Sequence, residues 1–135
     1  MEADLNEAVN TANDALFHLQ KADEILGHAE NWGFVDLFAG GMITTMIKRS
    51  KMSDAKREIE QAKRSMQRLS GYLQDFRNMP NMTVDMNGFL GFADYFFDGV
   101  VADWFVQTKI NDARRQVKDA ISEVQGILDG LEEMQ

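Results

Sequence analysis

The chain has 135 residues, of which 44% are hydrophobic and 27% charged, a composition typical of one globular domain. The absence of cysteine excludes disulfides, thiolate metal sites and a cysteine nucleophile, and the net charge of −8 disfavours non-specific binding to nucleic acid or anionic membranes. The longest charge-free apolar stretch, residues 37–47, is shorter than the roughly 20 residues of a membrane-spanning helix. We therefore expect a single cytoplasmic domain over residues 1–135, without nucleic acid, membrane span, metal or cofactor.

Residues 5–29 carry an uninterrupted seven-residue repeat, which predicts a long helix with one face in the core. One seam position holds Leu5, Ala12, Leu19 and Leu26, and the other holds Ala8, Ala15, Ala22 and Ala29. Because small side chains let helix axes approach closely, tight antiparallel packing is expected. Phe17 lies off the seam, and His18 and His28 each follow an acidic residue by four positions, as in ordinary surface pairs on a helix.

An aromatic-rich segment follows at residues 31–48, and Gly40-Gly41 predicts that it is a broken or bent short helix. Ser53 precedes Asp54 as an N-cap would, so a polar elbow and a second long helix are expected there. The seam of that helix holds Met52, Ile59, Met66 and Leu73 at one position and Ala55, Ala62, Leu69 and Phe76 at the other.

The second long helix is the basic part of an acidic chain. Residues 48–77 contain nine Lys or Arg and four Asp or Glu, a net charge of +5, whereas the rest of the chain carries −13. Bundles commonly place oppositely charged helices side by side, so a basic helix among acidic ones is expected. The least favoured hypothesis for the function is binding of a nucleic-acid backbone through Lys56, Arg57, Lys63, Arg64 and Arg68.

Residues 40–55, with the sequence GGMITTMIKRSKMSDA, resemble a pattern found in uncharacterised bacterial helical proteins. In that pattern a glycine cluster precedes Lys-His-Ser-Lys, an aliphatic residue and a nearby alanine. Arg49 stands where the pattern has its histidine, so no role of that histidine is carried over. The resemblance implies a helical fold and no established activity.

A connecting loop is expected over residues 78–88, which include the only proline, Pro80. The second aromatic-rich segment, residues 88–108, has apolar residues every three to four positions, as in a buried helix. Asn111 is expected to cap a third long helix. The seam of that helix holds Ile110, Val117, Val124 and Leu131 at one position and Ala113, Ala120, Ile127 and Met134 at the other.

Residues 33–59 recur as residues 91–117, and most differences between the two copies exchange similar residues. The alignment places Gly33-Phe34-Val35-Asp36-Leu37-Phe38 on Gly91-Phe92-Ala93-Asp94-Tyr95-Phe96. Internal repeats usually indicate stacked or symmetry-related units. We therefore predict an all-α bundle of three long alanine-seamed helices and two short aromatic helices, with repeat units at about residues 31–79 and 89–135.

Asp36 and Asp94 are the main candidate site residues, because both lie in apolar segments and they occupy matching positions in the duplication. They could form a ligand or metal site, but we favour the interpretation that each caps a helix or pairs with a buried cation, since an unpaired buried carboxylate is costly. With the neighbouring aromatic residues, the candidate ligand-binding set is Asp36, Asp94, Trp32, Phe38, Phe96 and Trp104.

The sequence favours a non-enzymatic helical interaction or scaffold module, acting on a protein partner or as a homodimer. Its two aromatic segments hold more large apolar side chains than one small domain readily buries. A protein that binds a small apolar ligand or lipid through these segments is the alternative. A further alternative is a metal-dependent enzyme that uses Asp36 and Asp94.

Overall fold

The computed structural model describes residues 2–27, 41–76, 86–96 and 110–135, and side chains for 4–27, 53–76, 87–96 and 113–135. Every regular element in these ranges is a helix: α1 (Glu2–Gly27), α3 (Gly41–Asp75), α4 (Met86–Tyr95) and α6 (Ile110–Glu133). The predicted all-α class is therefore confirmed. None of the described helices is long and apolar enough to cross a membrane.

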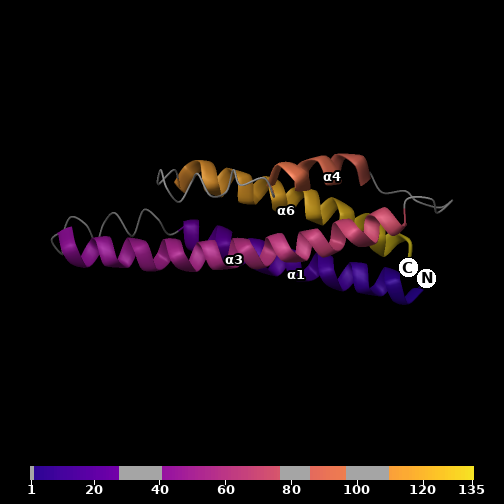
Figure 1. Ribbon diagram of the computed structural model, residues 1–135, viewed down its shortest axis with the longest axis horizontal. Helices are drawn as coiled ribbons and strands as arrows, with labels where there is room; N and C mark the ends of the chain where they lie inside the picture. Colours follow the sequence, from indigo (N-terminus) through magenta and orange to yellow (C-terminus); the bar gives the residue numbers. More distant parts are fainter. Residues whose placement is uncertain (1, 28–40, 77–85, 97–109) are drawn as a thin grey trace.

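Helix α1 packs extensively against both α3 and α6, and polar pairs between these helices establish their directions. The pairs are His18–Glu58 and Asp14–Arg68 toward α3, and Asp23–Arg114 and Asn6–Gln135 toward α6. In each set, the earlier of the two α1 residues meets the later of the two partner residues, so α3 and α6 run antiparallel to α1. The N-terminal end of α1 and the C-terminal residue consequently lie together at one end of the bundle (Figure 1).

The two seam positions of each long helix form the core. Every seam side chain that the structure describes is buried, except Met134, which is half-buried, so the predicted seams are confirmed. Val9 and Leu16 widen the stripe on α1 and are also buried. The seam alanines with no exposed surface are Ala8, Ala12, Ala15, Ala22, Ala55, Ala62 and Ala120. With side chains this small at so many contacts, there is little room for any larger residue.

Helix α4 contacts α3 and α6 and adds its apolar side to the same core. Phe89, Ala93 and Phe96 are buried, and their spacing of four and three residues places them on one helix face. Phe96 stacks on Phe92, with ring centroids 5.9 Å apart. The helix begins at Met86, inside the loop that was expected over residues 78–88, because one more turn brings Phe89 into the core.

The expected elbow at Ser53 is absent, because α3 runs without interruption from Gly41 to Asp75. Ser53 lies inside the helix with its side chain exposed and is not an N-cap. No glycine or proline occurs between Met42 and Ser70, so nothing in the backbone obliges the helix to stop. Asn111 likewise lies one residue inside α6, which begins at Ile110.

Candidate functional site

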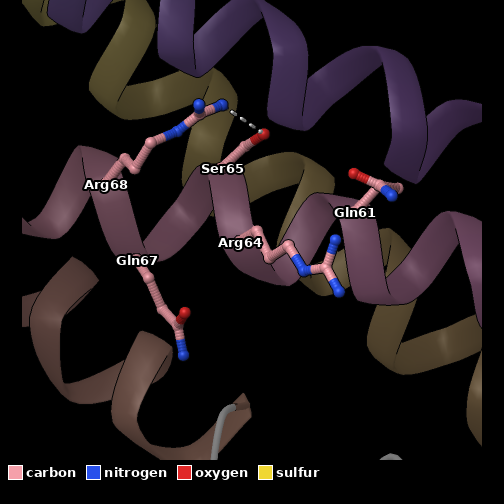
Figure 2. A pocket seen from close by; sticks show the side chains of 5 residues that line it. All are labelled: Gln61, Arg64, Ser65, Gln67 and Arg68. Atoms are coloured by element: carbon pink, nitrogen blue, oxygen red, sulfur yellow. Dashed lines mark hydrogen bonds between the residues drawn. The ribbon is translucent and has the colours of Figure 1, made fainter.

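The polar outer face of α3 holds a hollow of about 560 Å³ (Figure 2). It is lined by Gln61, Arg64, Ser65, Gln67 and Arg68, which occupy two successive turns between the seam residues. Because all five belong to one helix, their relative positions are set by the helix itself. In Figure 2, Arg68 reaches toward Ser65, Arg64 extends along the helix below it, and Gln67 points away from both.

A second hollow, of about 380 Å³, continues along α3 and shares Arg68 with the first. The residues that line it are Arg68, Gly71, Tyr72, Gln74 and Asp75. Gly71 is exposed, and a β-carbon placed there would meet no atom within 4 Å. The two hollows together extend along the helix from Gln61 to Asp75.

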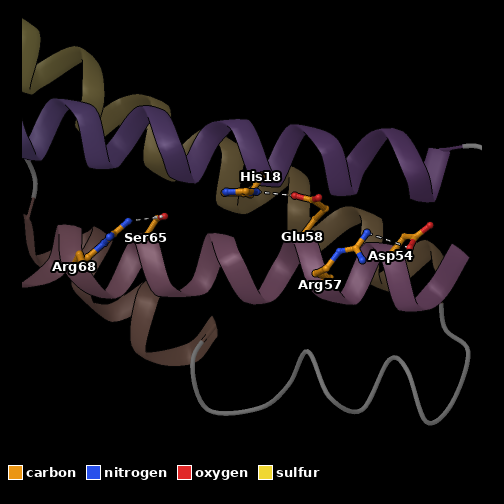
Figure 3. Close-up of polar contacts among 6 residues, drawn as sticks. All are labelled: His18, Asp54, Arg57, Glu58, Ser65 and Arg68. Atoms are coloured by element: carbon orange, nitrogen blue, oxygen red, sulfur yellow. Dashed lines mark hydrogen bonds and ion pairs between the residues drawn. The ribbon is translucent and has the colours of Figure 1, made fainter. Parts of the chain in front are cut away.

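The arginines on this face are held weakly by the rest of the molecule. Arg68 Nη2 donates to Ser65 Oγ at 3.4 Å (Figure 3). It also lies 4.0 Å from Asp14 Oδ2, and both of these charged side chains are more than 60% exposed. Arg64 forms no ion pair with the part of the chain that the structure describes. Solvent-exposed pairs of this kind contribute little stability, so these guanidinium groups are available to an anionic ligand.

His18 on α1 and Glu58 on α3 form a polar link between the two helices, with Nδ1 2.6 Å from Oε2 (Figure 3). The two side chains are 26% and 16% exposed. The sequence suggested Asp14 as the neighbour of His18, but the structure places Glu58 against the ring instead. The described residues contain no group of three His, Cys, Asp or Glu side chains that could hold a metal ion. We therefore assign this pair to holding α1 on α3.

The face of α1 opposite its seams carries an exposed aromatic residue. Phe17 is 54% exposed, its ring meets that of His18 edge to face at 5.2 Å, and Lys21 Nζ lies 4.8 Å from its centroid. Around it, α1 exposes uncharged amide side chains at Asn10, Asn13 and Gln20. Exposed charged residues lie there as well, at Asp14, Lys21 and Glu24.

Two of the six predicted site residues lie in the part that the structure describes. Asp94 is exposed near the end of α4, whereas Phe96, two residues later, has no exposed surface. The two side chains therefore lie in different environments, one facing solvent and one in the core. Trp32, Asp36, Phe38 and Trp104 fall outside the described residues, as does the connecting loop around Pro80.

Sequence reasoning found the cations of the α3 face but not the hollows between them. Arg64 and Arg68 belong to the basic residues of the nucleic-acid hypothesis, whereas Gln61, Gln67 and Gly71 belong to no sequence motif. The signal that was available is the seven-residue spacing of Arg57, Arg64 and Gly71, which places all three on the outer midline of the helix.

The chain matches no protein-family model, no curated protein and no solved structure. Its function is therefore inferred from the surfaces of its own helices.

Proposed function

We propose that this protein is a non-enzymatic helical interaction module that pairs with a second copy of itself through the outer face of α1. The observation that carries the proposal is the position of Phe17. Its ring is more than half exposed, although the seam residues of the same helix are buried almost completely. Covering such a ring removes apolar surface from water, which favours association.

The surroundings of Phe17 suit contact with an identical surface. A two-fold dimer brings each patch against its own copy, so a patch with a strong net charge would repel itself. Asn10, Asn13 and Gln20 are exposed and uncharged, and each amide can both donate and accept a hydrogen bond. Asp14 and Lys21 flank the patch with opposite charges, so an antiparallel pair of α1 helices can place one against the other.

The internal duplication is proposed to be architectural, and with it the plan of three long and two short helices. Ala55 and Ala113 occupy matching positions in the two copies, as do Ile59 and Val117, and all four are buried in the same core. This supports a repeat that preserves packing. The many large apolar residues of the two aromatic segments support an interaction role as well.

Sedimentation over a wide range of protein concentration tests the proposal. The wild-type chain is expected to form a dimer, and Phe17→Ser is expected to shift it toward the monomer. Tyr95→Ser is the matched control, because Tyr95 on α4 is the other large apolar side chain in the described residues that is about half exposed. A wild-type monomer at high micromolar concentration, or equal effects of the two variants, would refute the role of α1.

A further inference from the structure

The outer face of α3 has the properties of a docking site for a second, different molecule. We propose that the face between Gln61 and Asp75 binds an acidic α-helix of a partner protein, whose carboxylates meet Arg64 and Arg68. This goes beyond pairing through α1, since it uses another helix and another class of partner.

The first support for this is the availability of the charges. Arg64 has no ion pair within the described residues, and the contact of Arg68 with Asp14 is long and exposed. Residues four apart on a helix are about 6 Å from each other, which is also the spacing of carboxylates at i and i+4 on a facing helix. Guanidinium groups bind carboxylates with two parallel hydrogen bonds where the partner is planar, which gives both affinity and orientation.

The second support is the room beside these charges. The two hollows, of about 560 and 380 Å³, adjoin at Arg68 and follow the helix rather than entering the core. The helix from Gln61 to Asp75 is about 21 Å long at 1.5 Å per residue, which corresponds to nearly four turns of an opposing helix. Gln61, Gln67 and Gln74 add neutral donors and acceptors along this length.

The third support is Gly71, whose presence the described part of the fold does not require. A glycine inside a helix costs about 1 kcal/mol relative to alanine, and a β-carbon would meet nothing within 4 Å here. The missing side chain leaves the backbone of α3 open beside Arg68 and Tyr72, where a partner's backbone can approach closely. Packing within the described chain does not account for this residue, but close approach of a second helix does.

An acidic protein helix fits this face better than a nucleic acid. The basic stripe is interrupted by Glu60 and Asp75, and the chain outside residues 48–77 carries a net charge of −13. A polyanion with a charge on every unit is repelled by such surroundings, particularly at low salt. A helix with carboxylates on one side and small or apolar residues on the other can satisfy the arginines and still lie against Gly71 and Tyr72.

Fluorescence anisotropy with a labelled synthetic peptide tests the proposal on the full chain. The probe is a helix of alanines about 20 residues long, with glutamates at i and i+4 along one side. A peptide of the same composition, with its glutamates distributed around the helix, is the comparison. We expect the striped peptide to bind about tenfold more tightly than the distributed one, and Arg64→Glu to weaken it by about tenfold or more.

Two further variants separate docking from general charge effects. Lys118→Glu makes the same charge change on the exposed surface of α6 and should leave binding within about twofold. Gly71→Leu should fold as the wild type does, since the space is open, but should weaken the peptide about tenfold by blocking approach.

Equal binding of the two peptides, no binding at all, or tighter binding of a DNA duplex than of the striped peptide would overturn the proposal. Retention of full affinity in Gly71→Leu would overturn it too. Sedimentation of Arg64→Glu distinguishes this proposal from dimer formation through α1. A variant that still forms a dimer but does not bind the peptide shows that the two surfaces act independently.

Discussion

His18 Nδ1 on α1 lies 2.6 Å from Glu58 Oε2 on α3, and the two side chains are largely shielded from water. Gln116 on α6 lies 58 residues after Glu58, at the matching position of the predicted duplication. The side-chain oxygen Oε1 of Gln116 is buried and has no hydrogen-bond partner among the described residues. Glu58 therefore forms a polar link to α1, whereas Gln116 has a buried polar atom without a partner in the described part of the chain.

Removing the carboxylate of Glu58 should destabilise the fold. Glu58→Ala leaves the half-buried ring of His18 without its partner, and we expect a loss of about 1–2 kcal/mol of unfolding free energy in urea titrations. Glu58→Gln should cost less, because an amide oxygen still accepts a hydrogen bond. Asp54→Ala is the control on the same helix, since the Asp54–Arg57 pair is exposed and should contribute less than about 0.5 kcal/mol. Equal losses for Glu58→Ala and Asp54→Ala would contradict a role for the His18 link.

A substitution at Gln116 on α6 should have the opposite effect on stability. Gln116→Met replaces a buried oxygen, which has no partner within the described ranges, with an apolar group of similar shape, and we expect the unfolding free energy to stay constant or rise by about 1 kcal/mol. Glu58→Met, the same replacement at the equivalent position of α3, should lower it. A loss above about 1 kcal/mol in Gln116→Met would show that the amide nitrogen makes an essential contact.

The core and the polar link at His18 differ in how far the sequence predicts them. The seams at Ala62 and Ala120, like the rest of the core, follow from a seven-residue pattern that is a local property of each helix. The partner of His18 is not local: it depends on how far α3 slides along α1, which the repeat does not determine. Asp14, four residues away, was therefore the expected neighbour, and Glu58, forty residues away, is the observed one.

The candidate site also shows that local patterns are predictable from the sequence whereas the surroundings of a residue in the fold are not. Asp94 stands among apolar residues in the sequence, yet on α4 these residues lie largely on one side of the helix, with Phe89 and Phe96 in the core and Asp94 exposed. Neighbours along the chain thus overstated how apolar its surroundings are. Conversely, Arg64 and Gly71 are seven residues apart and share a face, which a search for catalytic motifs does not detect.

The alanine seams should not tolerate larger residues. Ala62 has no exposed surface, so Ala62→Leu forces side chains or helices apart and should cost about 1–3 kcal/mol. Gln67→Leu, on the exposed face of the same helix, should change the unfolding free energy by less than about 0.5 kcal/mol. Thermal unfolding of the two variants gives the comparison directly. Similar midpoints would mean that the helices are packed more loosely than the buried alanines indicate.

Replacing either of two exposed glycines, Gly71 or Gly126, with alanine should stabilise the fold, whereas the same change at Gly27 should not. Gly71 and Gly126 lie inside α3 and α6, and a β-carbon at either would meet nothing within 4 Å. Gly71→Ala and Gly126→Ala should therefore each raise the unfolding free energy by about 0.5–1 kcal/mol, through better helix propensity.

Gly27, the last residue of α1, is the comparison for both variants. A β-carbon there would lie 3.1 Å from Arg114 Nη2, and the Arg114 guanidinium is already paired with Asp23 at 3.2 Å. Gly27→Ala must displace that group, so its effect on the unfolding free energy should be neutral or negative. Urea titrations of the three variants distinguish the cases. A gain at Gly27 equal to that at Gly126 would show that the Arg114–Asp23 pair yields without cost, as exposed pairs do.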